Sequence, residues 1–153
     1  MKKIRNYFVL MMVALMSVAS FTSCNGDDDD DPESPASNSK IVGTWRCTHE
    51  KYIYKENGKV VEEYDGPYEG ILLYEFTSKG ILIMTESGED TEMATYTLSG
   101  DKLTITNDEG ATGVVYVKKL NKNNLEFEFT DKGTYDDGTT YEDYDYAKFE
   151  RIK

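Results

Sequence analysis

From Ile41 onward the chain alternates short β-prone runs with turn signals, and this pattern limits the possible fold more than any other feature. Gly and Asn in the breaks, as in Asn57-Gly58 and Asp137-Gly138, supply the positive φ that tight hairpins need. Asp65-Gly66-Pro67 is expected to be a further break. The pattern predicts strands at 43–55, 59–64, 71–77, 80–86, 92–98, 102–106, 113–120, 124–130 and 139–152.

Several of these runs alternate strictly between apolar and polar residues. Leu125, Phe127 and Phe129 alternate with Glu126 and Glu128, which predicts one buried and one wet face. A meander of this kind has exposed edges unless it closes on itself. We therefore predict an all-β fold, an antiparallel up-and-down β-barrel of eight or nine strands. An open sandwich is the alternative.

The N-terminus has the features of an export signal. A basic start, with Lys2, Lys3 and Arg5, precedes an apolar run over 7–19 that is too short to span a bilayer as a helix. The sequence Phe21-Thr22-Ser23-Cys24 then resembles the lipobox of bacterial lipoproteins. The resemblance implies a cleaved signal peptide, with a lipid on Cys24 that anchors the protein to a membrane. An ordinary signal peptide ending near a cysteine is the alternative.

The residues that follow Cys24 are acidic and almost free of apolar side chains. We expect 24–39 to be a disordered tether before a β-barrel domain at 40–153, with 1–23 as the signal peptide. The tether resembles the export signal of surface lipoproteins in one Gram-negative phylum. It predicts an outer-membrane location facing the cell surface, with the periplasmic face as the alternative. The run that carries this prediction is Asp27, Asp28, Asp29, Asp30 and Asp31.

The charge of the domain argues against anionic partners. From Lys40 onward the chain has 23 acidic and 14 basic residues, a net charge of −9. Such a domain repels nucleic acid, and we predict no nucleic-acid partner. The sequence identifies no protein partner. Cys47 has no disulfide partner once Cys24 carries lipid, so the core alone must hold the domain together.

Two candidate sites have both a chemical and a purely structural interpretation. Cys47 and His49 lie two residues apart and are expected on one face, where they would form half a metal site or an activated thiol. A buried cysteine and a hydrogen-bonded histidine are favoured instead. The acidic, tyrosine-rich segment 134–146 could bind Ca²⁺ or a sugar. A solvated hairpin is favoured over both, and we predict neither a metal nor a cofactor.

Gly43-Thr44-Trp45 opens the first predicted strand. A G-x-W at the start of a β-meander resembles the first signature of the lipocalins, and the domain is similar to the lipocalin-like domains of bacterial lipoproteins. The resemblance implies that Gly43 lets the chain bend into the barrel floor and that Trp45 plugs that end. It also implies that Arg151, from the last strand, packs over the indole ring.

Three functions follow from this fold. In the first, the barrel binds a small hydrophobic or amphipathic ligand in its mouth, under a lid formed by the 65–70 loop. The candidate ligand-binding residues are Tyr52, Tyr54, Tyr68, Tyr74 and Tyr96. In the second, the barrel is filled and serves as an interaction or structural subunit of an outer-membrane surface complex. The third, an enzyme, is disfavoured because the sequence has no catalytic motif. A filled barrel predicts that the large inward side chains, such as Phe76 and Phe149, interdigitate.

Overall fold

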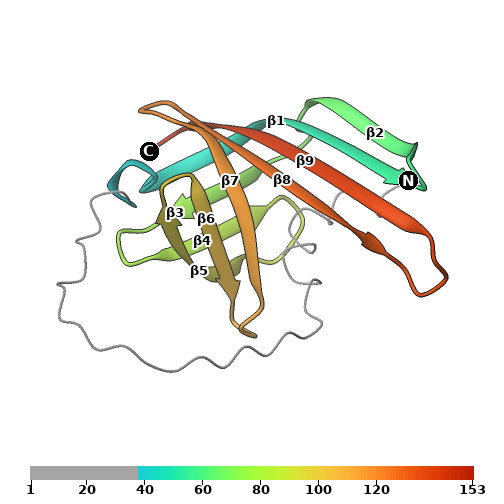
Figure 1. Cartoon of the computed structure of the whole chain (residues 1–153). Helices are drawn as coiled ribbons and strands as arrows, with labels where there is room; N and C mark the ends of the chain where they lie inside the picture. The colour runs from blue at the N-terminus through green and yellow to red at the C-terminus, as the bar shows by residue number, and fades with distance from the viewer. Residues whose placement is uncertain (1–37) are drawn as a thin grey trace, which may run out of the picture.

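The computed structural model describes residues 38–153, which form nine antiparallel strands after one short turn of helix (Figure 1). The predicted signal peptide (1–23), Cys24 and the aspartate run lie outside the described residues. The elements are η1 (Asn38–Lys40), β1 (Gly43–Glu56), β2 (Lys59–Pro67), β3 (Leu72–Phe76), β4 (Ile81–Glu86), β5 (Glu92–Ser99), β6 (Lys102–Asn107), β7 (Thr112–Leu120), β8 (Asn124–Thr134) and β9 (Thr140–Arg151).

Two local predictions were wrong. Asp65-Gly66-Pro67 does not break the chain, because all three residues pair in register with β1 and extend β2 to Pro67. Lys51 reinforces this pairing through an ion pair of 3.0 Å with Asp65. The expected disordered tether, 24–39, includes Asn38 and Ser39, which instead belong to the short 3₁₀ helix η1.

The sheet closes into a barrel, as the strand pattern predicted. β3 to β9 pair in chain order, and β9 returns to pair with β1 over nearly its whole length. β1 also pairs with β3, but only from Gly43 to Arg46. The result is a closed eight-stranded antiparallel barrel in which β2 is an additional strand. β2 pairs with the later half of β1, from His49 to Glu56.

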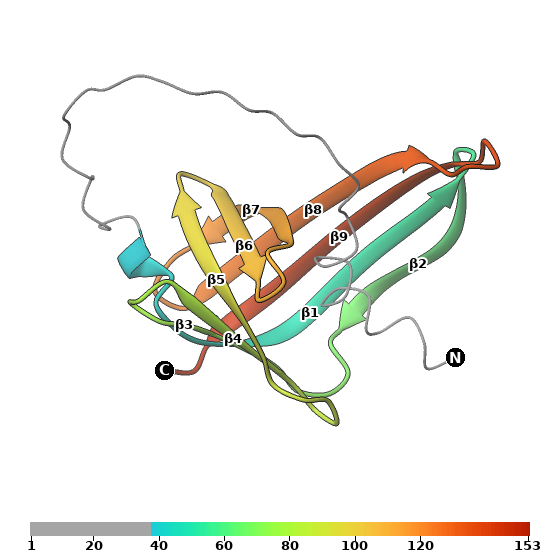
Figure 2. The same ribbon diagram turned by 90° about the horizontal axis from the view of Figure 1, so that it is seen from below.

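Because β1, β8 and β9 are longer than their neighbours, the barrel is closed at one end and splayed at the other. We call β2–β1–β9–β8 the long sheet and β3–β4–β5–β6–β7 the short sheet. Figure 2 shows the long sheet running well beyond the short sheet. β7 pairs with β8 only up to Glu128, so the two sheets separate above this point. We call the splayed end the open end and the other end the floor.

The floor is closed by a contact between the first and last strands. The guanidinium of Arg151 lies 4.0 Å from the centre of the Trp45 ring. It also donates hydrogen bonds to three backbone carbonyls, those of Lys40 and Val42 at 2.6 Å and Lys122 at 2.7 Å. Trp45 is fully buried and its indole N–H donates to the carbonyl of Ile41 at 2.7 Å. The N-terminal segment, the β7–β8 turn and β9 are therefore joined at one side chain.

Gly43 is required at the same place. Its φ of 137° is one that other residues rarely adopt. A Cβ on this residue would collide with the guanidinium of Arg151 and would lie 2.6 Å from the carbonyl oxygen of Lys153. A side chain at position 43 would therefore displace the Arg151 clamp.

We predict that Arg151→Ala lowers the free energy of unfolding by about 2–3 kcal/mol, because it removes a cation–π contact and hydrogen bonds from a charged group. Urea denaturation followed by the fluorescence of Trp45, the single tryptophan, measures this change. Arg46→Ala is the control, since Arg46 is exposed at the same end of β1. Equal losses in the two variants would contradict the clamp.

Candidate functional site

Aromatic rings pack against one another in the interior near the floor. Tyr74 lies 4.8 Å from Phe149 between ring centres, and Phe76 lies 4.9 Å from Tyr96. Phe127 contacts both Phe76 and Phe149, at 6.4 and 5.5 Å. All five rings are at most 3% exposed. These inward side chains interdigitate, so the closed end is a packed core and a ligand site has to be sought nearer the open end.

Above this core, the inner face of the long sheet changes from apolar to acidic and tyrosine-rich. The register places Tyr52 opposite Asp145, and Tyr54 opposite Asp143. On the next strand, Asp131 lies opposite Asp143. We call this surface the inner face. It comprises Glu50, Tyr52, Tyr54 and Glu56 of β1, Glu62 and Tyr64 of β2, Phe129 and Asp131 of β8, and Tyr141, Asp143 and Asp145 of β9.

Tyrosine hydroxyls donate hydrogen bonds to the carboxylates of this region. Tyr52 donates to Glu62 at 3.0 Å, and Tyr54 donates to Glu56 at 3.0 Å. Tyr141 donates to Asp131 at 3.1 Å. These bonds leave each carboxylate with further lone pairs for a ligand.

The tyrosine rings also support one another. The rings of Tyr52 and Tyr64 stack with their centres 5.9 Å apart. Those of Tyr135 and Tyr141 lie 4.9 Å apart, and the hydroxyls of Tyr54 and Tyr135 are 3.0 Å apart. Tyr141 crosses its register partner Gly133, where a Cβ would come within 2.7 Å of the ring. The tyrosines therefore form two contacting groups. Tyr52 and Tyr64 join β1 to β2, and Tyr54, Tyr135 and Tyr141 join β1 to the β8–β9 connection and β9.

Two carboxylates of the inner face are withdrawn from water, Asp143 almost fully and Asp145 in part, without a basic partner. Burial, followed by the nearby charges of Asp143 and Glu50, raises the pKa of Asp145 to about 7. Asp143 is 6% exposed, and burial together with Asp131 raises its pKa as well. Within residues 38–153, no ion pair joins Asp131, Asp143 or Asp145 to a basic side chain.

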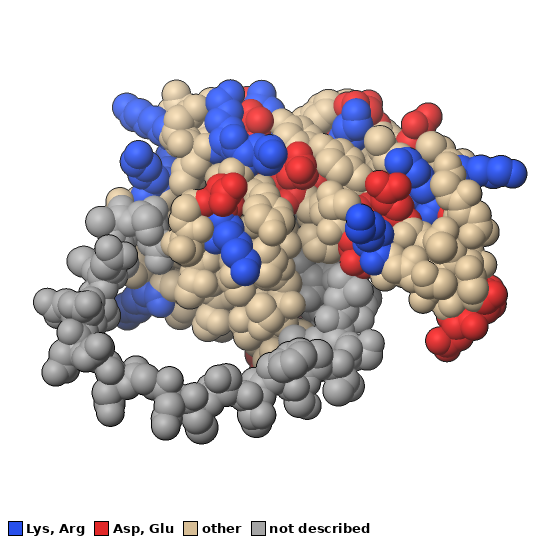
Figure 3. Space-filling model, in the orientation of Figure 1, with Lys and Arg blue, Asp and Glu red and all other residues tan. Residues whose placement is uncertain are grey.

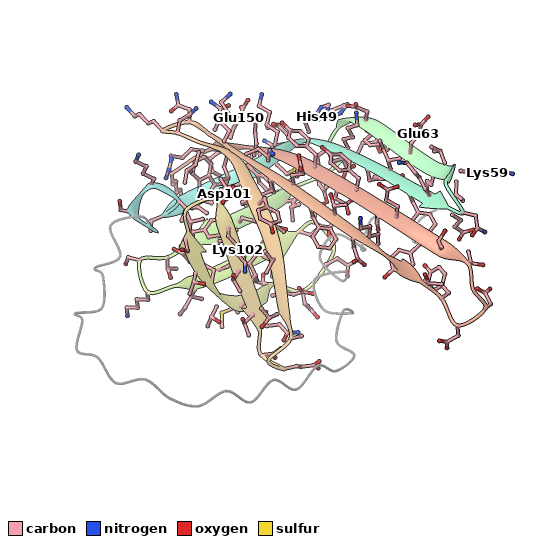
Figure 4. The ribbon with its side chains drawn as sticks, in the orientation of Figure 1. His49, Lys59, Glu63, Asp101, Lys102 and Glu150 are labelled. Carbon is pink, nitrogen blue, oxygen red and sulfur yellow. The ribbon has the colours of Figure 1, made fainter. Side chains whose placement is uncertain are left out.

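The outer face of the long sheet has the opposite character. Its lysines pair with carboxylates, as in Lys51 with Asp65, Lys55 with Glu142 and Lys148 with Glu150. Figure 3 shows basic and acidic side chains intermingled over the face in view. In Figure 4, His49, Glu63 and Glu150 point away from the barrel on this side. The long sheet thus has one charge-balanced face and one acidic face.

The hydroxyl of Tyr74 is an unsatisfied polar atom within the packed core. Tyr74 is 1% exposed, and its hydroxyl is the one buried side-chain polar atom of the described residues with no hydrogen-bond partner. Burial is the main cause that raises its pKa, and the titratable groups that add to this effect are Cys47 of the core, followed by Tyr68, Glu86 and Glu92. The missing hydrogen bond of this hydroxyl costs stability.

Cys47 and His49 do not share a face, which contradicts the period-two prediction. A register shift of β1 against β9 between these residues inserts Thr48 as a bulge. His49 consequently points outward and contacts Asp65 at 2.9 Å. Cys47 points inward at 3% exposure, where burial raises the pKa of its thiol to about 12. These two residues cannot form a common site, and the thiol is not activated.

The structure separates the five tyrosines that were candidates for ligand binding. Tyr52 and Tyr54 lie on the inner face, and Tyr68 lies near the open end, where it donates to Glu86 at 2.6 Å. Tyr74 belongs to the packed core, and its buried hydroxyl has no hydrogen-bond partner. Tyr96 lies toward the floor, where its hydroxyl donates to the carbonyl of Thr77 at 2.7 Å. The loop at 65–70, which was expected to form a lid, begins only after Pro67, because β2 continues to that residue.

Sequence reasoning did not select the inner-face residues of β8 and β9. Asp143 and Asp145 lie in the segment 134–146, which was expected to be a solvated hairpin, yet both carboxylates face inward. The signal was present, because Tyr141, Asp143, Asp145, Ala147 and Phe149 continue one period-two row. In residues 38–153 no group of three or more His, Cys, Asp and Glu side chains is arranged to hold a metal ion.

The fold and the site together define a small antiparallel barrel with one plugged end and one open end lined by tyrosines and carboxylates. The family model of the lipocalin-like domain matches residues 41–127, and the chain therefore belongs to that family. The match ends within β8, before the strand that closes the barrel. Members of this family are generally non-catalytic. The comparison with curated proteins returns no match.

We predict that Asp145→Asn raises the free energy of unfolding at pH 8 by about 1–3 kcal/mol. Asp145 faces Glu50 and Tyr52 of β1, Phe129 of β8 and Asp143 of its own strand. Its pKa is about 7 in the folded chain and near 4 when unfolded, so the folded state binds the extra proton between these values. The free energy of unfolding therefore decreases as the pH rises from about 4 to about 7 and Asp145 loses its proton in the folded state.

Urea denaturation of both proteins at pH 4 to 8 measures the effect, and the gain from the substitution should shrink toward pH 4. Asp136→Asn is the control, because Asp136 is exposed on the β8–β9 connection. A gain that is equal at pH 4 and pH 8 would contradict a buried, charge-repelled carboxylate at position 145.

Proposed function

We propose that this chain is a lipid-anchored cell-envelope lipoprotein whose lipocalin-like barrel binds a small amphipathic ligand at its open end. The observation that carries the proposal is the unpartnered hydroxyl of Tyr74, which is buried among the aromatic rings of the barrel interior. A ligand seated there would place an apolar part on the rings and a polar part against tyrosines and carboxylates. Binding sites commonly combine a mostly apolar surface with a few polar groups in this way.

The lipid anchor and its location are separate parts of the proposal. The lipobox-like sequence ending at Cys24 supports the anchor, and the aspartate run after it supports display on the outer membrane. The described residues are compatible with a peripheral anchor, since none of their helices is long and apolar enough to cross a membrane.

A second function is favoured by a different observation. The rings of the closed end pack against one another and fill the interior there. In addition, the outer edge of β2 and the 129–134 edge of β8 have no neighbouring strand within residues 38–153. Unpaired strand edges can accept a strand from another protein. In this alternative the barrel is a non-catalytic subunit of an outer-membrane surface complex.

Native mass spectrometry of the protein extracted from its own membrane should detect a bound small molecule. In the double variant Tyr52→Ala/Tyr54→Ala, the fraction of protein that carries this ligand should fall to less than a tenth of the wild-type value, because the substitutions remove two rings from the inner face. Tyr116→Ala is the control, since Tyr116 is exposed on β7. Recovery of wild-type protein without bound mass but with a stoichiometric protein partner would favour the second function.

The location is tested by replacing Asp27, Asp28, Asp29, Asp30 and Asp31 with Ala. We expect the variant to remain in the membrane fraction but to lose most antibody labelling on intact cells, because the export signal is gone and the lipid remains. Cys24→Ala is the comparison, and it should leave the membrane fraction altogether. Unchanged surface labelling of the aspartate variant would overturn the role of the run.

A further inference from the structure

The charged residues of the barrel are divided unevenly between its two ends. The segments toward the floor contain ten basic and five acidic residues, and they are 38–47, 75–81, 98–104, 116–128 and 146–153. The remaining segments, toward the open end, contain four basic and eighteen acidic residues. The net charge of −9 therefore combines a basic end with a strongly acidic end. A molecule with this charge distribution turns its floor toward an anionic surface.

Six basic residues at the floor are exposed, and none of them has an ion pair within residues 38–153. They surround the end of the barrel and are Lys40 of η1, Arg46 of β1, Lys79 of the β3–β4 turn, Lys102 of β6, Lys122 of the β7–β8 turn and Lys153 after β9. Figure 3 shows basic side chains projecting at this end, where the C-terminus lies in Figure 1. Farther along β1, Lys51 and Lys55 are instead paired with carboxylates.

An exposed apolar side chain lies among these bases. Ile152 follows Arg151 and is 51% exposed. Its backbone N–H donates to the carbonyl of Thr44 at 2.8 Å, so β1 fixes the position of Ile152 at the floor. Lysine stems and exposed aliphatic groups are both accommodated at the boundary between lipid headgroups and acyl chains. The floor therefore combines the two kinds of side chain that suit a membrane surface.

The floor is also the end of the barrel from which the chain continues toward the proposed lipid anchor. Fifteen residues separate Cys24 from Lys40, whose carbonyl accepts a hydrogen bond from Arg151 at the floor. That length of chain spans at most about 55 Å. β1 has 14 residues and by itself extends about 45 Å from the floor toward the open end. The anchor therefore brings the floor nearer to the bilayer than any other part of the domain.

The distribution of the six bases fits an extended anionic surface better than a short acidic peptide. The aspartate run of the same chain is the competing occupant, and its five residues span at most about 17 Å. The bases are distributed around a closed ring of eight strands, which measures about 38 Å at about 4.8 Å per strand. A layer of phosphates can contact all sides of this ring at once, whereas one short run cannot.

We propose that the floor is a membrane-facing surface that binds the anionic phosphate groups of lipid headgroups. The exposed lysines of the floor contact the phosphates, and Ile152 contacts the apolar layer beneath them. The open end consequently points away from the bilayer, so that a ligand reaches the inner face from the aqueous side. This inference rests on the proposed lipid anchor and specifies how the anchored domain is oriented.

Trp45 makes the orientation measurable, because it is the single tryptophan of the chain and lies at the floor. The lipidated full-length protein is reconstituted into vesicles of phosphatidylcholine, or of phosphatidylcholine with one third phosphatidylglycerol. Both contain a trace of lipid with a dansyl group on its headgroup, and energy transfer from Trp45 reports how near the floor lies. We expect at least twofold higher transfer efficiency on the anionic vesicles at low salt. Added salt should return it to the value on neutral vesicles.

Matched double variants separate the floor from the general charge of the protein. Lys79→Gln/Lys122→Gln removes two charges from the floor and should abolish at least half of the difference between the two kinds of vesicle. Lys59→Gln/Lys132→Gln removes the same charge from exposed lysines toward the open end and should leave the difference unchanged. Figure 4 shows Lys59 at the far end of the long sheet. All four side chains are exposed, so neither variant disturbs the core.

Equal transfer on the two kinds of vesicle, or equal effects of the two double variants, would overturn the inference. Transfer that depends on vesicle charge only after Asp27–Asp31 are replaced with Ala would also overturn it, and would assign the floor to the aspartate run. Sedimentation with neutral vesicles tests the anchor separately. Protein that sediments with both kinds of vesicle but shows equal transfer retains the anchor and loses only the orientation. Protein that does not sediment with neutral vesicles refutes the anchor and the inference together.

Discussion

The pairing of β1 with β9 is the constraint on which the rest of the structure depends. It closes the barrel between Trp45 and Arg151 and continues to Glu56, far beyond the point where β3 leaves β1. One continuous ladder therefore performs two tasks. Near the floor it fixes the first and last strands so that Arg151 covers Trp45. Near the open end it holds a sheet that the short strands of the barrel do not cover.

The position of the candidate site follows from how the interior is filled. An eight-stranded barrel encloses little more than its own side chains. Here Trp45, Tyr74, Phe76, Phe127 and Phe149 occupy the closed end. The inward row of β9 then changes from Phe149 and Ala147 to Asp145 and Asp143 once the short sheet ends. The alternation of side chains along β9 that buries rings at the floor places carboxylates on the same face nearer the open end. The core and the candidate site are therefore successive parts of one row of inward side chains.

Much of the fold could be predicted from the sequence, because each strand is bounded by turn residues and alternates on its own. The boundaries of β5 and β6 differ from the expected ones by a single residue at most. The errors occurred where tertiary pairing overrides local signals. Asp65-Gly66-Pro67 has turn chemistry but is held extended by β1, and the Thr48 bulge rotates His49 away from Cys47. A bulge depends on the partner strand, so period-two counting within one strand cannot detect it.

The same limit explains why the inner-face carboxylates were not selected as a site. Acidic residues near a hairpin are usually solvated, and composition alone favours that interpretation for 134–146. What distinguishes Asp143 and Asp145 is their shared row with Phe149, which becomes informative once β9 is known to cross the whole barrel. Like-charged carboxylates that are held together without a cation destabilise the free protein. The fold tolerates this cost because the Arg151 clamp and the aromatic core stabilise the other end of the barrel.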